Sequence, residues 1–577
     1  MKGTGLKGAC AGVLAAMATG TIPCRAGVTV KDFGPDGVGG YPVLVARDVK
    51  GPARIRLSYA THPKGLGPKG DFWHETRATY LGEEVDLPIL PASTDRFDIF
   101  DVPTNGIYRA PLQQGLVRYV RIEIETGDAA VEVRFENRGT HSEEPVVGSF
   151  SCSDERVNGV WRASVRTCSL AAIPARTEPL HVVTAKTNVV LGTSHAYLSD
   201  GAKRDRLVWS GDLWWAQRNM YVAFASDSPY MPGSIRMMAE NRTPSGYVQA
   251  CPYPESHGPL AEGDWGPFGS DEFAAWFVPV LWDHYLHTAD EASLRAGWPA
   301  TVGLMAYLGR HQGADGIFEQ RKETCKHAAG LRFGGTSLHH RAFMNILLWK
   351  TYVDAACLAE AKGENGLAAR WRESARRLAD SVRARFWDGA RGFFRLSAEE
   401  DRLGFEANAL ALATRFATPE EADRILPHLK RDAHGKFQAL AARGAFEYGR
   451  AEKAMELVAA HNWYGILAPD WAGMRTTQEC MNLHTGGWGD EAHPDTAIAG
   501  MFTNYLLGVE PLEPGYRRFR IRPRPTATVV SAKGRVPTPH GFVEVEWHLE
   551  AGRPKVRFTA PPGTEGVVET EPPPASR

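Results

Sequence analysis

The chain has 577 residues, enough for about three to five domains, and its 43% hydrophobic and 23% charged residues are typical of a globular protein. This composition excludes a disordered chain and a collagen-like fibre. Sixty-six Lys and Arg against 67 Asp and Glu give a net charge of −1, so no basic excess is present to bind a nucleic acid. The 16 Trp residues suit a cleft that stacks on sugars, although they also suit a large core.

Residues 1–26 have the features of a signal peptide. Lys2 and Lys7 give a positively charged start, residues 9–22 form an apolar run of small residues, and Ala26-Gly27 offer a cleavage point. A disordered N-terminus is the alternative, but we expect the protein to be exported. No later stretch approaches 18 uninterrupted apolar residues, so no membrane span is expected.

The cysteines and histidines do not predict a metal site. Six of the eight cysteines lie beyond residue 26, without CxxC pairs or the spacing of zinc ligands, and in an exported protein they leave room for one disulfide. The sequence also lacks a phosphate-binding P-loop, a dinucleotide-binding glycine fingerprint and a G-x-S-x-G nucleophile elbow. We therefore expect neither a metal nor a cofactor.

Residues 27–147 alternate apolar with charged side chains, as half-buried antiparallel strands do. The alternation is clearest in residues 117–125 and 131–136, and Gly and Pro interrupt the rest of the region. The pattern predicts an N-terminal β-sandwich.

Residues 148–509 have apolar side chains at the spacing of three and four that is typical of helices. Stretches such as 271–287, 345–362, 366–387 and 492–507 bring the expected number of helices to about a dozen. A dozen helices in antiparallel pairs can close into an (α/α)6 toroid, whose loops at one end form a cleft. No fixed sequence period favours a solenoid instead.

Residues 510–577 return to the alternation of strands, clearly in residues 542–550, and predict a smaller C-terminal β-sandwich. The predicted fold is therefore a multidomain α and β protein, with a central (α/α)6 toroid between two β-sandwich domains.

Residues 200–212 contain the densest group of reactive side chains. The carboxylates of Asp200, Asp205 and Asp212 lie among cations and a tryptophan, directly before an expected helix. Mutual repulsion of such carboxylates raises the pKa of one of them, which suits a general acid, although Arg204 and Arg206 oppose that shift if they point inward. A charged surface loop, with Asp212 as the N-cap of the helix, is the alternative reading.

A second candidate region lies near the end of the predicted toroid. Glu479 follows Arg475-Thr476-Thr477-Gln478, and Trp488 lies between glycines that leave its ring accessible. The alternative here is a glycine-rich loop in which Asp490 or Asp495 caps the last helix. Trp265, in the loop of residues 262–272, is expected to line the same cleft.

The sequence resembles the inverting α-L-rhamnosidases, whose signature reads roughly D-x-x-x-R-[ED]-R-x-x-W-x-G-D. Thr476-Thr477-x-Glu479 resembles the loop that carries the general base in that family, and residues 506–523 resemble its closing stretch. The three matches occur in the order of the family and span roughly residues 150–525. The residues that match the signature are Asp200, Arg204, Asp205, Arg206, Trp209, Gly211 and Asp212.

The resemblance implies a toroid of six helical hairpins flanked by β-sandwiches, and an inverting mechanism. It places Asp205 at the position of the general acid and Glu479 at that of the general base. In an inverting glycosidase the two carboxyl groups are about 6.5–9.5 Å apart, which leaves room for a water molecule. The residues placed where the family grips the sugar are Asp200, Arg204, Trp209 and Asp212, with Trp488 stacking on its apolar face.

Two departures from the family bear on the site. The acid position is usually Glu, so either the backbone approaches the substrate more closely at Asp205 or Asp212 takes over the acid role. Where the family often has His-Gly-Trp, this chain has Gly486-Gly487-Trp488. The histidine contact to the sugar is therefore absent or supplied by His493.

The expected partner is a carbohydrate, with a terminal α-L-rhamnose or a related sugar cleaved from an oligosaccharide or glycoside. Two alternatives remain. The first is a polysaccharide lyase or another toroidal glycosidase. A lyase would need a Tyr or His base beside an Arg or a metal, for which Tyr247 and His257 are available, and would leave an unsaturated product that absorbs in the ultraviolet. A catalytically silent sugar-binding protein would bind the sugar without turnover. The oligomeric state stays open.

Overall fold

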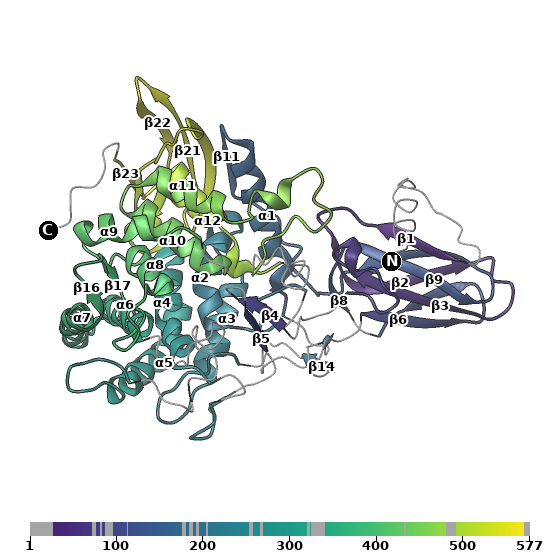
Figure 1. The fold of residues 1–577 in the computed structure, drawn as a ribbon, viewed down its shortest axis with the longest axis horizontal. Coiled ribbons are helices and arrows are strands. Elements are labelled where there is room, and N and C mark those ends of the chain that lie inside the picture. The colour runs from purple at the N-terminus through teal and green to yellow at the C-terminus, as the bar shows by residue number, and fades with distance from the viewer. Residues whose placement is uncertain are drawn as a thin grey trace, which may run out of the picture.

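The computed structural model describes most of the chain and places the N-terminal strands at one end of the helical region (Figure 1). Of residues 77–80, 83–86, 180–183, 188–191 and 341 it describes the backbone alone. The fully described residues are 27–71, 96–111, 113–175, 195–203, 206–252, 258–265, 269–319, 324, 342–431, 434–479 and 492–569.

Two antiparallel sheets form the N-terminal region. The first has the order β1 (Val28–Asp32), β9 (Tyr119–Thr126), β3 (Ala53–Ala60) and β6 (Phe97–Val102). The second has the order β10 (Ala130–Glu136), β2 (Val38–Arg47) and β7 (Gly106–Arg109), and β8 (Gln114–Val117) also pairs with β2.

Alternating apolar residues of both sheets share one core. In the register, Leu57 of β3 faces Ile122 of β9, and Leu44 of β2 faces Val133 of β10. All four side chains belong to the same buried cluster. In β9 and β10 the residues next to Ile122 and Val133 are charged and less buried. The period of two read from the sequence thus sets which face of each strand is buried.

The helical region contains hairpin-like pairs of helices. The bounds of its helices are α1 (Glu155–Ala171), α2 (Ser210–Ala223), α3 (Tyr230–Glu240), α4 (Asp271–Thr288), α5 (Glu291–Arg310), α6 (Arg341–Ala361), α7 (Asn365–Phe386), α8 (Phe405–Ala413), α9 (Pro419–Ile425), α10 (Gly435–Glu447) and α11 (Ala451–Ala460).

Contacts between the even-numbered helices run around a ring. α2 packs on α4, α4 on α6, α6 on α8 and α8 on α10, and α10 returns to α2 through η6 (Pro494–Thr496). The helices of the ring and those outside it differ in how much of their surface is buried, as α4 and α7 show. α4 is apolar and buried on nearly all sides, whereas α7 buries only one stripe, with residues such as Trp371, Ala375 and Leu378, and exposes its charged residues.

The stretch of residues 492–507 is not the single helix that its spacing predicts. It divides into η6, α12 (Ala499–Met501) and the π-helix η7 (Phe502–Leu507). Pro494 has no N–H and disfavours helical backbone in the residue before it, so His493 is extended. Ala497 is also extended, which separates η6 from α12.

The last sheet joins the two ends of the helical region. Its order is β11 (Ser149–Cys152), β20 (Ser531–Thr538), β21 (Gly541–Glu550) and β22 (Arg553–Thr559), so residues before α1 pair with residues near the C-terminus. The indole Nε1 of Trp547 donates to the carbonyl of Leu506 at 2.9 Å, which fixes this sheet against η7. A smaller sheet contains β18 (Val509–Pro511), β19 (Arg518–Ile521) and β23 (Glu565–Val568).

Four two-stranded sheets complete the part of the chain that the structure describes. They are β4–β5 (Arg77–Tyr80 and Glu83–Asp86), β12–β15 (Ala172–Ile173 and Tyr197–Leu198), β13–β14 (Leu180–Val183 and Asn188–Leu191) and β16–β17 (Trp387–Asp388 and Phe393–Phe394).

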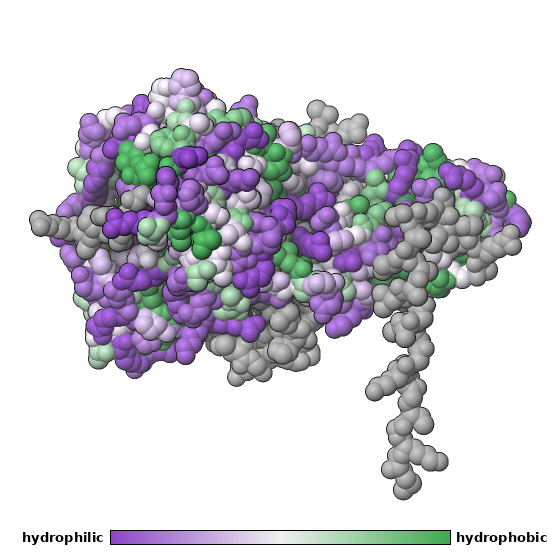
Figure 2. Space-filling view, turned by 90° about the horizontal axis from the view of Figure 1, so that it is seen from above, coloured by the Kyte–Doolittle hydropathy of each residue, from purple (hydrophilic) through white to green (hydrophobic). Residues whose placement is uncertain are grey.

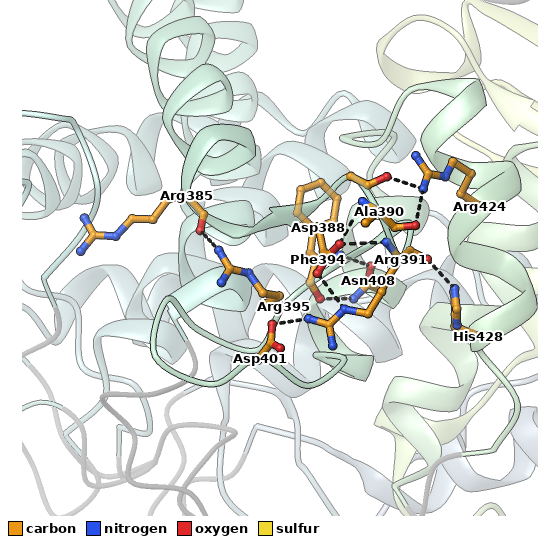
Figure 3. A network of polar contacts seen from close by, with 11 residues as sticks. Arg385, Asp388, Ala390, Arg391, Phe394, Arg395, Asp401, Asn408, Arg424 and His428 are labelled. Atoms are coloured by element: carbon orange, nitrogen blue, oxygen red, sulfur yellow. Dashed lines mark hydrogen bonds and ion pairs between the residues drawn. The ribbon is translucent and has the colours of Figure 1, made fainter.

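Polar contacts hold the β16–β17 hairpin to the helices beside it (Figure 3). Within the hairpin, the carboxylate of Asp388 accepts from Arg391 at 2.7 Å. Between the hairpin and α8, the side-chain amide of Asn408 donates to the carbonyl of Phe394 at 2.7 Å. Because Asp388 and Arg391 are at the surface, this pair contributes little to stability.

On the face shown in Figure 2 the described residues are mostly hydrophilic, and the apolar ones appear as separate patches. Among the described helices, none combines the length and the hydropathy that crossing a membrane requires.

Candidate active site

The carboxylate of Glu479 lies between two histidines. Its Oε1 is 3.3 Å from Nε2 of His434, and its Oε2 is 4.0 Å from Nδ1 of His493. All three side chains are buried, and the backbone N–H of Gly435 donates to the carbonyl of Glu479 at 2.9 Å. A buried carboxylate between two imidazoles is an arrangement that can accept a proton and is held in one orientation.

Lys436 connects two further carboxylates at the same place. Its ammonium Nζ is 3.1 Å from Oδ1 of Asp212 and 3.6 Å from Oδ2 of Asp495. Lys436 lies in the first turn of α10, two residues after His434, and Asp212 lies in the first turn of α2. The Glu479 pair and the Lys436 pair are therefore at the same end of the helical ring.

Aromatic rings extend this group of residues towards α4. The ammonium of Lys436 is 5.7 Å from the ring centre of Phe273 and 5.4 Å from that of Trp215. The ring of Trp209 meets the ring of Phe273 edge-on at 5.4 Å, and Trp209 is buried. The structure thus brings Trp209, Asp212 and Glu479 into one region, built from the N-terminal ends of α2, α4 and α10.

Trp265 belongs to an adjoining aromatic cluster. Its ring is 5.0 Å from that of Tyr247 and 6.3 Å from that of Tyr307. The hydroxyl of Tyr247 accepts from the backbone N–H of Ser270, the N-cap residue of α4. Tyr247 is fully buried, which gives no support to a role as the base of a lyase, and His257 is outside the described residues.

Asp200 shapes the segment that follows it. Its Oδ1 accepts from the backbone N–H of Leu207 at 3.1 Å, and its own N–H donates to the carbonyl of Leu207 at 2.9 Å. Arg206, fully buried and with a positive φ of 59°, donates to the carbonyl of Ala202 at 2.6 Å. Burial lowers the pKa of its guanidinium. These contacts join Asp200 to Leu207 and Ala202 to Arg206.

Two side chains donate hydrogen bonds to the carboxylate of Asp271. Tyr307 donates to its Oδ1 at 2.7 Å and Thr324 to its Oδ2 at 2.5 Å. Ser270, not Asp271, caps α4, and Asp212 likewise lies three residues after the N-cap position of α2, which Trp209 occupies. The capping role that the sequence suggested as the alternative for Asp212 is therefore wrong.

Three residues predicted for the site, namely Arg204, Asp205 and Trp488, lie outside the described residues. The structure therefore gives no distance between the carboxyl groups of Asp205 and Glu479. Within the described part of the chain, no group of three or more His, Cys, Asp or Glu is arranged to hold a metal ion.

Sequence reasoning missed His434 and Lys436. One signal was available, since a lysine in the first turn of a helix is opposed by the helix dipole and is favoured there only beside acidic groups. The sequence did not show which acids these were, because Asp212 lies 224 positions away.

Two family models match the chain. The bacterial alpha-L-rhamnosidase 6 hairpin glycosidase domain matches residues 180–441, and the bacterial alpha-L-rhamnosidase C-terminal domain matches residues 508–573. Together they cover more than half of the chain. No curated protein matches it.

Solved rhamnosidases share the fold. The GH78 family rhamnosidase of Bacillus sp. GL1 has a TM-score of 0.68 and 17% identity, over 94% of this chain and 54% of that one. The Streptomyces avermitilis α-L-rhamnosidase complexed with L-rhamnose also has a TM-score of 0.68 and 17% identity, over 96% and 50%. The Klebsiella oxytoca rhamnosidase with rhamnose bound has a TM-score of 0.60 and 16% identity, over 83% and 88%. The chain thus spans about half the length of the first two.

Proposed function

Because the chain belongs to the bacterial α-L-rhamnosidase family, with a six-hairpin glycosidase domain and a C-terminal domain, we propose that it is an inverting glycoside hydrolase. It removes a terminal α-L-rhamnose, or a related sugar, from an oligosaccharide or glycoside. The observation that carries the proposal is the position of Glu479, buried beside His434 at the same end of the ring as Asp212 and Lys436. Rhamnose bound to the Streptomyces and Klebsiella proteins, which share the fold, is consistent with this sugar.

The architecture proposed with this function is an (α/α)6 toroid, residues 148–509, between β-sandwiches of residues 27–147 and 510–577. The ring of contacts between the even-numbered helices supports the toroid, and the common core of the two N-terminal sheets supports the first sandwich. Export directed by residues 1–26 belongs to the same proposal.

In the proposed reaction, Asp205 and Glu479 act on opposite faces of the sugar. Glu479 takes a proton from a water molecule as the water oxygen bonds to the anomeric carbon, and Asp205 gives a proton to the glycosidic oxygen as its bond to that carbon breaks. A separation of about 6.5–9.5 Å between the two carboxyl groups leaves room for the water. Glu479 lies beyond the residues that the glycosidase model matches, so its role is supported by its geometry and by its sequence motif.

The remaining candidates bind the sugar in this proposal. Asp212 is held by Lys436, and a carboxylate in that state can accept charge-assisted hydrogen bonds from sugar hydroxyls. His493 lies 4.0 Å from the other carboxylate oxygen of Glu479, which supports assigning it a contact to the sugar. The other residues assigned to substrate binding are Asp200, Arg204, Trp209, Trp265 and Trp488.

A panel of 4-nitrophenyl glycosides, α-L-rhamnoside included, tests the function. We expect release of 4-nitrophenol from the rhamnoside or from a related sugar. Glu479→Gln should lower the rate on these glycosides about 10²–10⁴-fold, and Asp205→Asn should do so on methyl α-L-rhamnoside, whose poor leaving group needs a proton. The proposal is wrong if both variants keep the activity of the wild type on every substrate that it cleaves. A lyase product absorbing in the ultraviolet, or sugar binding without turnover, would favour the two alternative functions.

A further inference from the structure

One short segment of the N-terminal sheets touches both loops that carry the proposed catalytic acid and base. The segment is residues 114–119, from β8 to the start of β9, and Figure 1 shows β8 at the end of these sheets that faces the helices. Its contacts reach residues 200–207, which include the acid, and residues 472–479, which end in the base.

Buried charges fix the acid loop to the N-terminal sheets. Nζ of Lys203 donates to Oδ2 of Asp71 and to Oγ1 of Thr61, both at 2.9 Å. Nη1 of Arg96 donates to the other oxygen of Asp71 at 2.7 Å. The side chains of Lys203, Asp71 and Arg96 are fully buried. A buried ion pair of this kind is costly to break, because the remaining charge has no solvent to stabilise it.

Arg96 also connects this cluster to the segment. Its Nε donates to Oε1 of Gln114 at 3.1 Å, and its Nη2 donates to the carbonyl of Leu116 at 2.7 Å. Between these two residues, Gly115 approaches the acid loop so closely that a Cβ placed there would be 1.9 Å from the carbonyl oxygen of Ala202. The backbone of the segment therefore packs directly on the acid loop.

The other end of the segment holds the base loop. Nη1 of Arg118 donates to the carbonyl of Gly473 at 2.6 Å, and the hydroxyl of Tyr119 donates to the carbonyl of Ala472 at 2.9 Å. A third contact joins the backbone N–H of Arg475 to the carbonyl of Pro35 at 2.8 Å. Asp32 accepts from Arg118 at 3.1 Å and so orients the guanidinium.

We propose that residues 114–119 are a spacer that sets the separation of the acid and base loops, and that Lys203 and Tyr119 are positioning residues of the reaction. This inference rests on the proposed function. Gly115 and Tyr119 are four residues apart, at most about 13 Å, and the chain bends at Arg118 between them. Lys203 and Arg206, which flank positions 204 and 205 in the sequence, are both anchored by buried hydrogen bonds. Inverting hydrolysis depends on the separation of the two carboxyl groups, because one must reach the glycosidic oxygen and the other the attacking water at the same anomeric carbon.

The leaving-group dependence of the rate distinguishes positioning from a general structural role. A displaced acid harms a substrate with a poor leaving group more than one with a good leaving group, which departs without a proton. Lys203→Met should therefore lower kcat on methyl α-L-rhamnoside about tenfold more than on the 4-nitrophenyl glycoside. Tyr119→Phe, which loosens the base loop, should lower kcat on both substrates by a similar factor of about 3–10.

Two matched variants in the same sheets serve as controls. Lys31→Met removes a lysine that donates to the carbonyl of Val133, and Tyr59→Phe removes a buried hydroxyl that donates to Asp98. Neither residue contacts a catalytic loop through these bonds. Both control variants should keep the wild-type ratio of the two kcat values, even where their stability falls.

Amide hydrogen exchange gives a readout that does not require activity. Exchange should become faster in residues 198–207 of Lys203→Met and in residues 472–479 of Tyr119→Phe, and the controls should leave both segments unchanged. Unchanged exchange in both variants overturns the proposal, as does faster exchange in Lys203→Met with an unchanged leaving-group ratio. If the wild type cleaves no glycoside, the proposed function fails, and the exchange data alone then decide whether the segment anchors the two loops.

Discussion

Lys436 and Asp212 are 224 positions apart in the chain, yet the ammonium of Lys436 lies 3.1 Å from a carboxylate oxygen of Asp212. The same ammonium lies 3.6 Å from Asp495, so one cation compensates two carboxylates that would otherwise repel each other. All three groups are mostly buried, where such a charge balance has a large effect. Lys436 thereby offsets the repulsion between Asp212 and Asp495 and holds the carboxylate of Asp212 in one orientation.

Replacing Lys436 with Met should weaken substrate binding. Loss of a hydrogen bond to a charged group costs roughly 1.5–3 kcal/mol, so kcat/KM should fall about 10- to 100-fold. Lys453→Met is a suitable control, since Lys453 pairs with the exposed Glu456 on α11. A Lys436→Met enzyme that folds and keeps the wild-type kcat/KM would show that this cation does not position Asp212.

Glu479→Gln should abolish most of the activity while keeping the fold. The amide has nearly the same shape as the carboxylate but cannot accept a proton from water, so kcat should fall about 10²–10⁴-fold. Glu456→Gln, on the exposed face of α11, should have no effect on kcat. Steady-state kinetics on the substrate that the wild type cleaves fastest would make the comparison.

His434→Phe should lower kcat by roughly 10- to 100-fold, because it removes the imidazole 3.3 Å from Glu479. His434→Gln keeps an amide donor and should retain more of the activity. The order wild type, Gln, Phe in kcat, with similar thermal stability of the two variants, is the expected result. Equal kcat values for all three proteins would exclude a role for His434 in orienting the carboxylate.

Stability should fall with decreasing pH partly because of His287. Burial lowers the pKa of this imidazole from its ordinary value of 6.5 to about 4, and its ring stacks on Tyr221 at 4.7 Å. Between pH 6.5 and 4 the unfolded chain thus binds more protons than the folded protein, so the free energy of unfolding decreases as the pH falls. The full effect is roughly 3 kcal/mol.

Urea unfolding of the wild type and of His287→Phe at a series of pH values isolates this contribution. The stability difference between the two proteins should change in favour of the variant as the pH falls from 6.5 to 4. A constant difference over that interval would mean that His287 does not titrate as described. The comparison is needed because burial raises the pKa of Asp354 to about 6, which gives the opposite pH dependence between pH 4 and 6.

Local periodicity predicted the regular elements well. The alternation in residues 117–125 and 131–136 corresponds to β9 and β10, and the helix expected at residues 366–387 corresponds to α7 within one residue at each end. These patterns are local, because burial of one face repeats along the strand or helix itself. At Pro494 the apolar spacing continued but the helix did not.

Partners that are distant in the chain could not be predicted in this way. Asp71 and Lys203 are each ordinary charged residues in sequence, and only the packing of the N-terminal sheets on the loop makes them a buried pair. The pairing of β11 with β20 is similar, since it joins residues 149–152 to residues 532–535. The family signature pointed to the region that we propose as the site, whereas the contacts of His434 and Lys436 required the structure.

The anomer of the first sugar released tests the central claim most directly. Proton NMR during hydrolysis of an α-L-rhamnoside, or of whichever glycoside the wild type cleaves, records the product before it mutarotates. A water molecule activated by Glu479 attacks from the face opposite to the leaving group, so the account predicts that the β-anomer appears first from an α-glycoside. Initial release of the α-anomer would contradict it, because retention requires a nucleophilic carboxylate about 5–5.5 Å from the acid.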